Sequence, residues 1–157
     1  MKLYILRHGI AEDRAPGMAD ADRRLTREGA ERMRREARAF ARIGVDPEAI
    51  VTSPLPRARE TAEIVAQGLG LRDALRIDER LASAFGLGEC SELVTAEPSL
   101  TRWMLVGHEP TLSLLASRLT GGSLIELKKG GLILVETDRM EPGAGRLKWL
   151  LTPATIL

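Results

Sequence analysis

Three short segments of the sequence bring together residue types that bind and transfer phosphoryl groups. Arg7-His8-Gly9 follows an apolar run, Arg57 follows Ser53-Pro-Leu-Pro, and Gly107-His108 follows a second apolar run. A planar guanidinium can bind two phosphate oxygens at once, so the two arginines favour a compact, multiply charged anion. The same segments hold both histidines of the chain, which indicates chemistry beyond binding.

The histidines add a nucleophile to this anion site. A neutral imidazole nitrogen can attack phosphorus and form a covalent phosphohistidine, while arginines stabilise the charge on the equatorial oxygens. The chain has no glycine-rich nucleotide loop and no carboxylate cluster suited to Mg²⁺. His8 and His108 lie far apart in the chain without cysteine partners, so a zinc site has little support.

The hydrophobic pattern predicts the elements that must position these residues. Strands are expected at 2–7, 49–52, within 71–78, and at 103–106, 132–137 and 147–151; helices are expected at 27–43, 57–68, 91–96 and 111–119. Thr26 is a suitable N-cap for the first helix, and Gly44 ends it. Strands that alternate with helices indicate an α/β layered sheet.

In this arrangement the candidate residues share one edge of the sheet. Arg7-His8, Ser53 and His108 each follow the carboxyl end of a predicted strand. Ligands of open α/β sheets bind outside those ends, so the three segments should converge on one crevice. The helices that begin near Arg57 and after His108 would also direct their positive N-termini towards it. Ser53 itself is interpreted as a cap between strand and helix, with a phosphate contact as the alternative.

Composition narrows the class of protein. The 157 residues carry a net charge of +1 and are 44% hydrophobic, which fits a single domain over residues 1–157 and predicts neither nucleic-acid nor membrane binding.

The arginines of residues 23–42 alternate with glutamates and are interpreted as a solvated helix face, with an acidic docking partner as the alternative. Cys90 is the only cysteine, so no internal disulfide can form, and a cytoplasmic location is expected. Nothing in the sequence sets an oligomeric state.

The motifs "LRHG", "SPLPRARET" and "VGHEP" together resemble the histidine phosphatase superfamily, also called phosphoglycerate-mutase-like. Their order and the small size are most similar to its phosphohistidine phosphatase branch, the SixA-like proteins. The resemblance implies a three-layer α/β/α sandwich with a mostly parallel mixed sheet and one antiparallel strand, which residues 132–151 could supply. It also implies that His8 is the nucleophile, that Arg7, Arg57 and His108 hold the phosphoryl oxygens, and that no metal or organic cofactor takes part.

The resemblance leaves the proton donor open. Glu79 matches the glutamate that serves many relatives and is the first choice, whereas Glu109 matches the acid that follows the second histidine in another branch. Neither is needed if the substrate is phosphohistidine, because the leaving imidazole needs less acid help than an alkoxide. The mutase branch has an asparagine shortly after Arg-His-Gly, where this chain has Glu12 and Asp13, which argues against a mutase.

Three functions remain for this sequence. The first is a phosphatase that removes phosphate from phosphohistidine on a protein, such as a phosphotransfer domain, through a covalent intermediate. The second is the same chemistry on a small phosphorylated metabolite, and the third is a non-catalytic phosphate-binding module. The first is favoured because only residues 79–101 are available between the middle motif and the strand at 103–106 to cover the crevice, and residues 9–25 are expected to form a loop. A shallow, open crevice holds a small metabolite poorly but admits a residue displayed on a folded partner.

Overall fold

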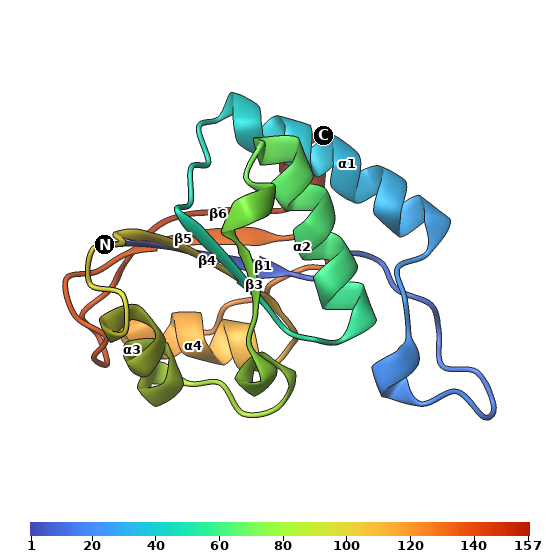
Figure 1. Cartoon of the computed structure of the whole chain (residues 1–157). Helices are drawn as coiled ribbons and strands as arrows, with labels where there is room; N and C mark the ends of the chain where they lie inside the picture. The colour runs from blue at the N-terminus through green and yellow to red at the C-terminus, as the bar shows by residue number, and fades with distance from the viewer.

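The structure is a computed structural model that describes residues 1–157, and a six-stranded sheet forms its centre (Figure 1). The strands are β1 (Lys2–Arg7), β2 (Ala49–Thr52), β3 (Leu75–Ile77), β4 (Arg102–Gly107), β5 (Leu132–Glu136) and β6 (Arg146–Leu151). The helices are α1 (Arg27–Arg42), α2 (Pro56–Leu69), α3 (Leu87–Thr95), α4 (Thr111–Leu119) and α5 (Pro153–Ile156), with 3₁₀ turns η1 (Asp20–Asp22), η2 (Arg72–Ala74) and η3 (Glu79–Ala82). None of the helices is both long enough and apolar enough to span a bilayer.

The sheet is mixed, with a single strand running against the others. Its order is β3-β2-β4-β1-β5-β6. β2 pairs in parallel with β3 and β4, and β1 pairs in parallel with β4. β5 pairs in the antiparallel sense with both β1 and β6. The hairpin of residues 132–151 therefore supplies the one antiparallel strand, and the expected sheet is confirmed.

Helices cover both faces of this sheet, which explains why the central strands are continuously apolar. α1, α2 and α5 lie on one face, and α3 and α4 lie on the other (Figure 1). Alternate residues of β1 point to opposite sides: Leu3 and Ile5 pack under α3 and α4, whereas Tyr4 and Leu6 pack under α1 and α2. The layers are those of the expected three-layer α/β/α sandwich.

The start of α3 differs from the expectation by more than one residue. α3 begins at Leu87 rather than near residue 91, because the Glu89 carboxylate accepts a hydrogen bond from the Gly86 N–H at 2.8 Å and caps the helix there. β3 at Leu75–Ile77 lies within the expected range 71–78, after a 3₁₀ turn over Arg72–Ala74. The earlier start of α3 moves no candidate site residue.

Candidate active site

Strand register brings the three sequence segments to one level at one edge of the sheet. Arg7 at the end of β1 pairs with Gly107 at the end of β4, and the His8 N–H donates to the Gly107 carbonyl at 3.0 Å. On the other side of β4, the Ser53 N–H donates to the Val106 carbonyl at 3.0 Å. His8, Ser53 and His108 are therefore the first residues beyond three neighbouring strands, as the sequence predicts.

His8 is buried, and its ring is held by its own chain. Nδ1 lies 2.8 Å from the Gly9 carbonyl, which can only accept, so Nδ1 carries the proton and Nε2 is the free nitrogen. The Gly9 N–H in turn donates to the Thr61 hydroxyl of α2 at 3.0 Å. A Cβ at Gly9 would lie 2.8 Å from Met33 Cγ. The glycine therefore lets α1 approach the backbone that orients the nucleophile.

His108 lies opposite His8, and Ser53 holds it. The two ring centroids are 5.3 Å apart. His108 Nε2 lies 2.8 Å from Ser53 Oγ, which already accepts the Leu55 N–H at 3.2 Å. The Ser53 hydroxyl can then donate its hydrogen to Nε2, which puts the ring proton of His108 on Nδ1. Ser53 thus holds the turn before α2, whose N-cap is Leu55, and is also a partner of His108. Nothing in the sequence indicates the contact with His108.

The two arginines share one arrangement. Arg7 Nη1 donates to the Leu127 carbonyl at 2.9 Å. Arg57 Nη1 donates to the Asp20 carbonyl at 2.7 Å, and Nη2 donates to the Asp20 carboxylate at 3.1 Å. One terminal nitrogen of Arg7 and both terminal nitrogens of Arg57 are thus anchored, whereas the Nε–H of each guanidinium is buried and has no partner.

Unpartnered buried donors are therefore concentrated at this site. The protein has four buried side-chain polar atoms without a hydrogen-bond partner, and three of them are Arg7 Nε, Arg57 Nε and His108 Nδ1. A buried donor without a partner is costly, at about 1–3 kcal/mol. Donors left in this state beside an imidazole are suited to bind the oxygens of an incoming anion.

Burial and positive charge keep both histidines neutral. Burial, together with the nearby His108, Arg57 and Arg7, lowers the pKa of His8 to about 3, against the Gly9 hydrogen bond. Burial also lowers the pKa of His108 to about 4, with the two arginines acting in the same direction. A neutral His8 Nε2 retains the lone pair that a nucleophile needs.

The two candidate proton donors differ in their surroundings. Glu79 opens the 3₁₀ turn after β3 and is exposed, at the same edge of the sheet as Ser53 because Ile77 pairs with Thr52. Glu109 caps α4, because its Oε1 accepts the Ser113 N–H at 3.0 Å. The Glu109 carboxylate is thus already engaged, whereas no hydrogen bond holds the Glu79 side chain.

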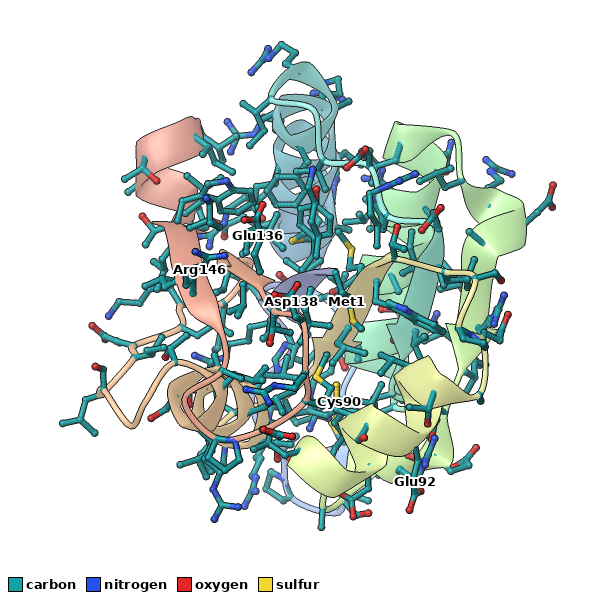
Figure 2. The ribbon with its side chains drawn as sticks, turned by 90° about the vertical axis from the view of Figure 1, so that its left-hand side faces the viewer. Met1, Cys90, Glu92, Glu136, Asp138 and Arg146 are labelled. Atoms are coloured by element: carbon teal, nitrogen blue, oxygen red, sulfur yellow. The ribbon has the colours of Figure 1, made fainter.

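Other features lie away from this edge. No three side chains of His, Cys, Asp or Glu converge in a way that could hold a metal ion. Cys90 is buried beneath the sheet (Figure 2), and burial raises the pKa of its thiol to about 12.

A polar pocket of about 610 Å³ is lined in part by Met1, Glu136, Asp138 and Arg146 (Figure 2). It lies at the amino end of β1, about 20 Å of strand away from His8.

Comparison with known proteins defines the class to which this fold and site belong. A profile of the histidine phosphatase superfamily (branch 1) matches residues 3–97. An uncharacterised protein of Picosynechococcus sp. (strain PCC 7002) is 38% identical over 154 residues, which cover 94% of this chain and 89% of that protein. The chain belongs to the histidine phosphatase superfamily.

Within the superfamily the similarity is to the SixA-like branch. Phosphohistidine phosphatase SixA of Escherichia coli K12 is 26% identical over 159 residues, which cover 99% of this chain and 96% of SixA. A structure of the protein histidine phosphatase SixA with tungstate superposes with a TM-score of 0.88 at 25% identity, over 100% of both chains. A mycobacterial glucosyl-3-phosphoglycerate phosphatase shares the fold with a TM-score of 0.74 at 19% identity, covering 94% of this chain and 96% of its own.

Proposed function

We propose that this protein is a phosphatase that removes the phosphoryl group from phosphohistidine on a partner protein, with His8 as the covalent nucleophile. The observation that carries the proposal is the set of three buried donors without partners, Arg7 Nε, Arg57 Nε and His108 Nδ1, beside a neutral His8. Donors fixed before the substrate arrives need no reorganisation as charge develops on the phosphoryl oxygens.

The chemistry has two steps. In the first, the lone pair of His8 Nε2 attacks phosphorus, a P–N bond forms at His8, and the P–N bond of the substrate breaks. The leaving imidazole takes a proton from the solvent or from an acid such as Glu79. In the second, a water oxygen attacks phosphorus, an O–P bond forms, and the P–N bond at His8 breaks, with its electron pair returning to Nε2. The proton that the water loses passes to the solvent or to the departing inorganic phosphate. The Gly9 carbonyl keeps Nδ1 protonated throughout, so His8 returns to its starting tautomer.

The position of the segment 79–101 favours a protein substrate. Its helix α3 packs against the sheet through buried Cys90 and Val94, so α3 is part of a layer and does not cover the strand ends. Loops approach the edge with His8 instead: the segment around Asp20 reaches Arg57, and the one around Leu127 reaches Arg7. A site bordered by loops, with no helix across it, suits a side chain displayed on a folded partner. The name of the SixA relative, a phosphohistidine phosphatase, supports the same substrate class.

The test compares substrates and traps the intermediate. We expect kcat/KM for a phosphohistidine-bearing phosphotransfer domain to exceed that for phosphorylated sugars and glycerates. Rapid quenching with labelled substrate should give a phosphoenzyme that is labile in acid and stable in base, and His8→Ala should abolish it. Inorganic phosphate should still bind to His8→Ala through the arginines and His108.

Each contrary result points to a different alternative. A metabolite that exceeds the protein substrate ten-fold or more, about 1.4 kcal/mol in transition-state binding, would favour a small-molecule phosphatase. Absence of both turnover and phosphoenzyme in the unaltered protein would favour a phosphate-binding module. Full turnover by His8→Ala would exclude His8 as the nucleophile.

A further inference from the structure

The segment between β1 and α1 reaches back over the candidate active site. Its base is closed by a bridge between Ala11 and Leu25 and by a 2.9 Å hydrogen bond from the Glu12 N–H to the Arg24 carbonyl. The Leu25 N–H is also bound by the Glu60 carboxylate of α2 at 2.8 Å. This anchoring sets where the far end of the segment, the 3₁₀ turn that begins at Asp20, can lie.

Asp20 fixes the orientation of Arg57 by occupying its two terminal nitrogens. Its main-chain carbonyl accepts from Nη1 at 2.7 Å, and its carboxylate accepts from Nη2 at 3.1 Å. With this end of the guanidinium taken, the remaining buried edge is the one that carries the unpartnered Nε–H. A planar group held at two points cannot rotate its third donor out of place.

The Asp20 carboxylate is itself held in place. Its other oxygen, Oδ1, accepts from Arg23 Nη1 at 2.9 Å and from Arg14 Nε at 3.3 Å. Hydrogen bonds from Arg23 and the charge of Arg57 lower the pKa of Asp20 to about 2, so it stays ionised at any pH of interest. Arg7 differs, because a neutral carbonyl, that of Leu127, anchors it. Of the two arginines at the site, Arg57 is therefore the one that a charged side chain orients.

We propose that Asp20 is a positioning residue that directs the Nε–H edge of Arg57 at the phosphoryl group. The inference rests on the proposed function, because it assumes that Arg57 binds the phosphoryl oxygens. Asp20 does not touch the substrate in this scheme and acts through Arg57 alone. Its loss should therefore lower kcat more than it weakens binding of inorganic phosphate, since orientation matters most as charge redistributes in the transition state.

The experiment is a double-mutant cycle on an aryl phosphate. Asp20→Asn keeps the main-chain contact and the shape of the side chain but removes the charge. We expect kcat to fall roughly 10-fold, as is typical when a group that orients a ligand is lost, while the inhibition constant of inorganic phosphate changes less than about 3-fold. In the Arg57→Ala background the same substitution should have no further effect, because there is no guanidinium left to orient. Asp22→Asn, on the same turn and without a contact to Arg57, is the matched control and should keep the kcat of the unaltered protein.

The outcomes separate this inference from the proposed function. An unchanged kcat in Asp20→Asn, or an equal loss in the Arg57→Ala background, would overturn the role of Asp20. A kcat in Arg57→Ala equal to that of the unaltered protein would instead remove Arg57 from the phosphoryl site, and with it the proposed function as stated. Thermal unfolding of every variant checks that the assays are made on folded protein.

Discussion

The rings of His8 and His108 face each other at the ends of β1 and β4, with centroids 5.3 Å apart and planes inclined by 54°. Two imidazolium cations this close would repel, and the structure avoids that cost because burial keeps both rings neutral. A bound phosphoryl dianion has the opposite effect, since it stabilises the protonated, cationic form of any ring that binds it. His108 can then act as a cationic donor in the complex, while His8 has to stay neutral until it attacks.

This relationship predicts how the histidines titrate. The chain has only two, so the imidazole NMR signals can be assigned with His8→Asn and His108→Asn. In the free protein we expect pKa values near 3 for His8 and near 4 for His108, well below the ordinary 6.5. Tungstate should raise the pKa of His108. A His8 that titrates near 6.5 in the free protein would contradict the neutral nucleophile.

The same shifts predict a loss of stability in acid. Each histidine binds a proton more readily in the unfolded chain than in the folded one. The free energy of unfolding should therefore decrease as the pH falls from about 6.5 towards 3–4. Urea titrations of the unaltered protein and of His8→Asn across that window measure the effect. The variant should lose less stability than the unaltered protein, and equal losses would show that His8 is not the group responsible.

Ser53 should control which nitrogen of His108 carries the proton. In Ser53→Ala the hydrogen bond to Nε2 is lost, so the ring can adopt the tautomer that presents no N–H from Nδ1. We expect kcat to fall about 3- to 10-fold, which corresponds to a hydrogen bond of about 0.5–1.5 kcal/mol. Ser113→Ala removes another hydroxyl, one that bonds only to the Pro110 carbonyl of its own helix turn, and should leave kcat unchanged. Ser53→Ala with full activity would show that His108 needs no such partner.

The sequence predicted the strand ends well, because each of them combines a buried apolar run with a change to polar residues. Arg7, His8 and His108 could be placed at one edge from that pattern, and the register of β1 with β4 confirms the placement. The link between Asp20 and Arg57 could not be predicted in this way. It joins residues 37 positions apart through a segment with no periodic pattern, and only the folded chain shows where such a segment lies.

The burial of helix α1 was predicted only in part. Helical spacing of apolar residues predicts an inner stripe of Ala30, Met33, Ala37, Phe40 and Ala41. Met33, Ala37 and Phe40 are buried, but Ala30 is only partly buried and Ala41 is exposed. Glu36 is fully buried instead, although its type and its place among arginines suggest a solvated position. The sequence cannot show that Arg32 and the loop before β5 close over this side chain.

The identity of the proton donor can be tested with two leaving groups. An alkyl phosphate needs a proton on its leaving oxygen, whereas an aryl phosphate needs little. We expect Glu79→Gln to slow the alkyl substrate at least about 10-fold and the aryl substrate much less, because general acids typically contribute 10²- to 10⁴-fold. Glu109→Gln should lower both alike, since Glu109 caps α4. The reverse pattern would assign the role to Glu109, and no difference in either variant would favour chemistry without an acid.

Stability should also depend on pH through Glu36, in the opposite sense to the dependence that the two histidines cause. Burial raises the pKa of Glu36 to about 7, against the hydrogen bond and charge of Arg32, and its Oε2 has no partner. The carboxylate lies against Gly130, where a Cβ would collide with it and where φ is +79°. The Gly130 N–H donates to the carbonyls of Arg7 and His8, so Glu36 lies directly behind the backbone of the nucleophile.

The folded chain thus holds the proton of Glu36 more tightly than the unfolded chain does. The stability that this protonation contributes is fully present below pH 4.5 and is lost as the pH rises through about 7. Glu36→Gln mimics the protonated form, so it should unfold at higher urea than the unaltered protein at pH 8. The difference should be roughly 3 kcal/mol at most, because the pKa rises from 4.5 to about 7 on folding, and should shrink towards pH 5. Glu31→Gln, on the exposed side of the same helix, should differ from the unaltered protein by nearly the same small amount at both pH values. If Glu36→Gln shows no larger effect at pH 8 than at pH 5, Glu36 is already ionised in the folded protein at pH 5 and its burial costs the fold little.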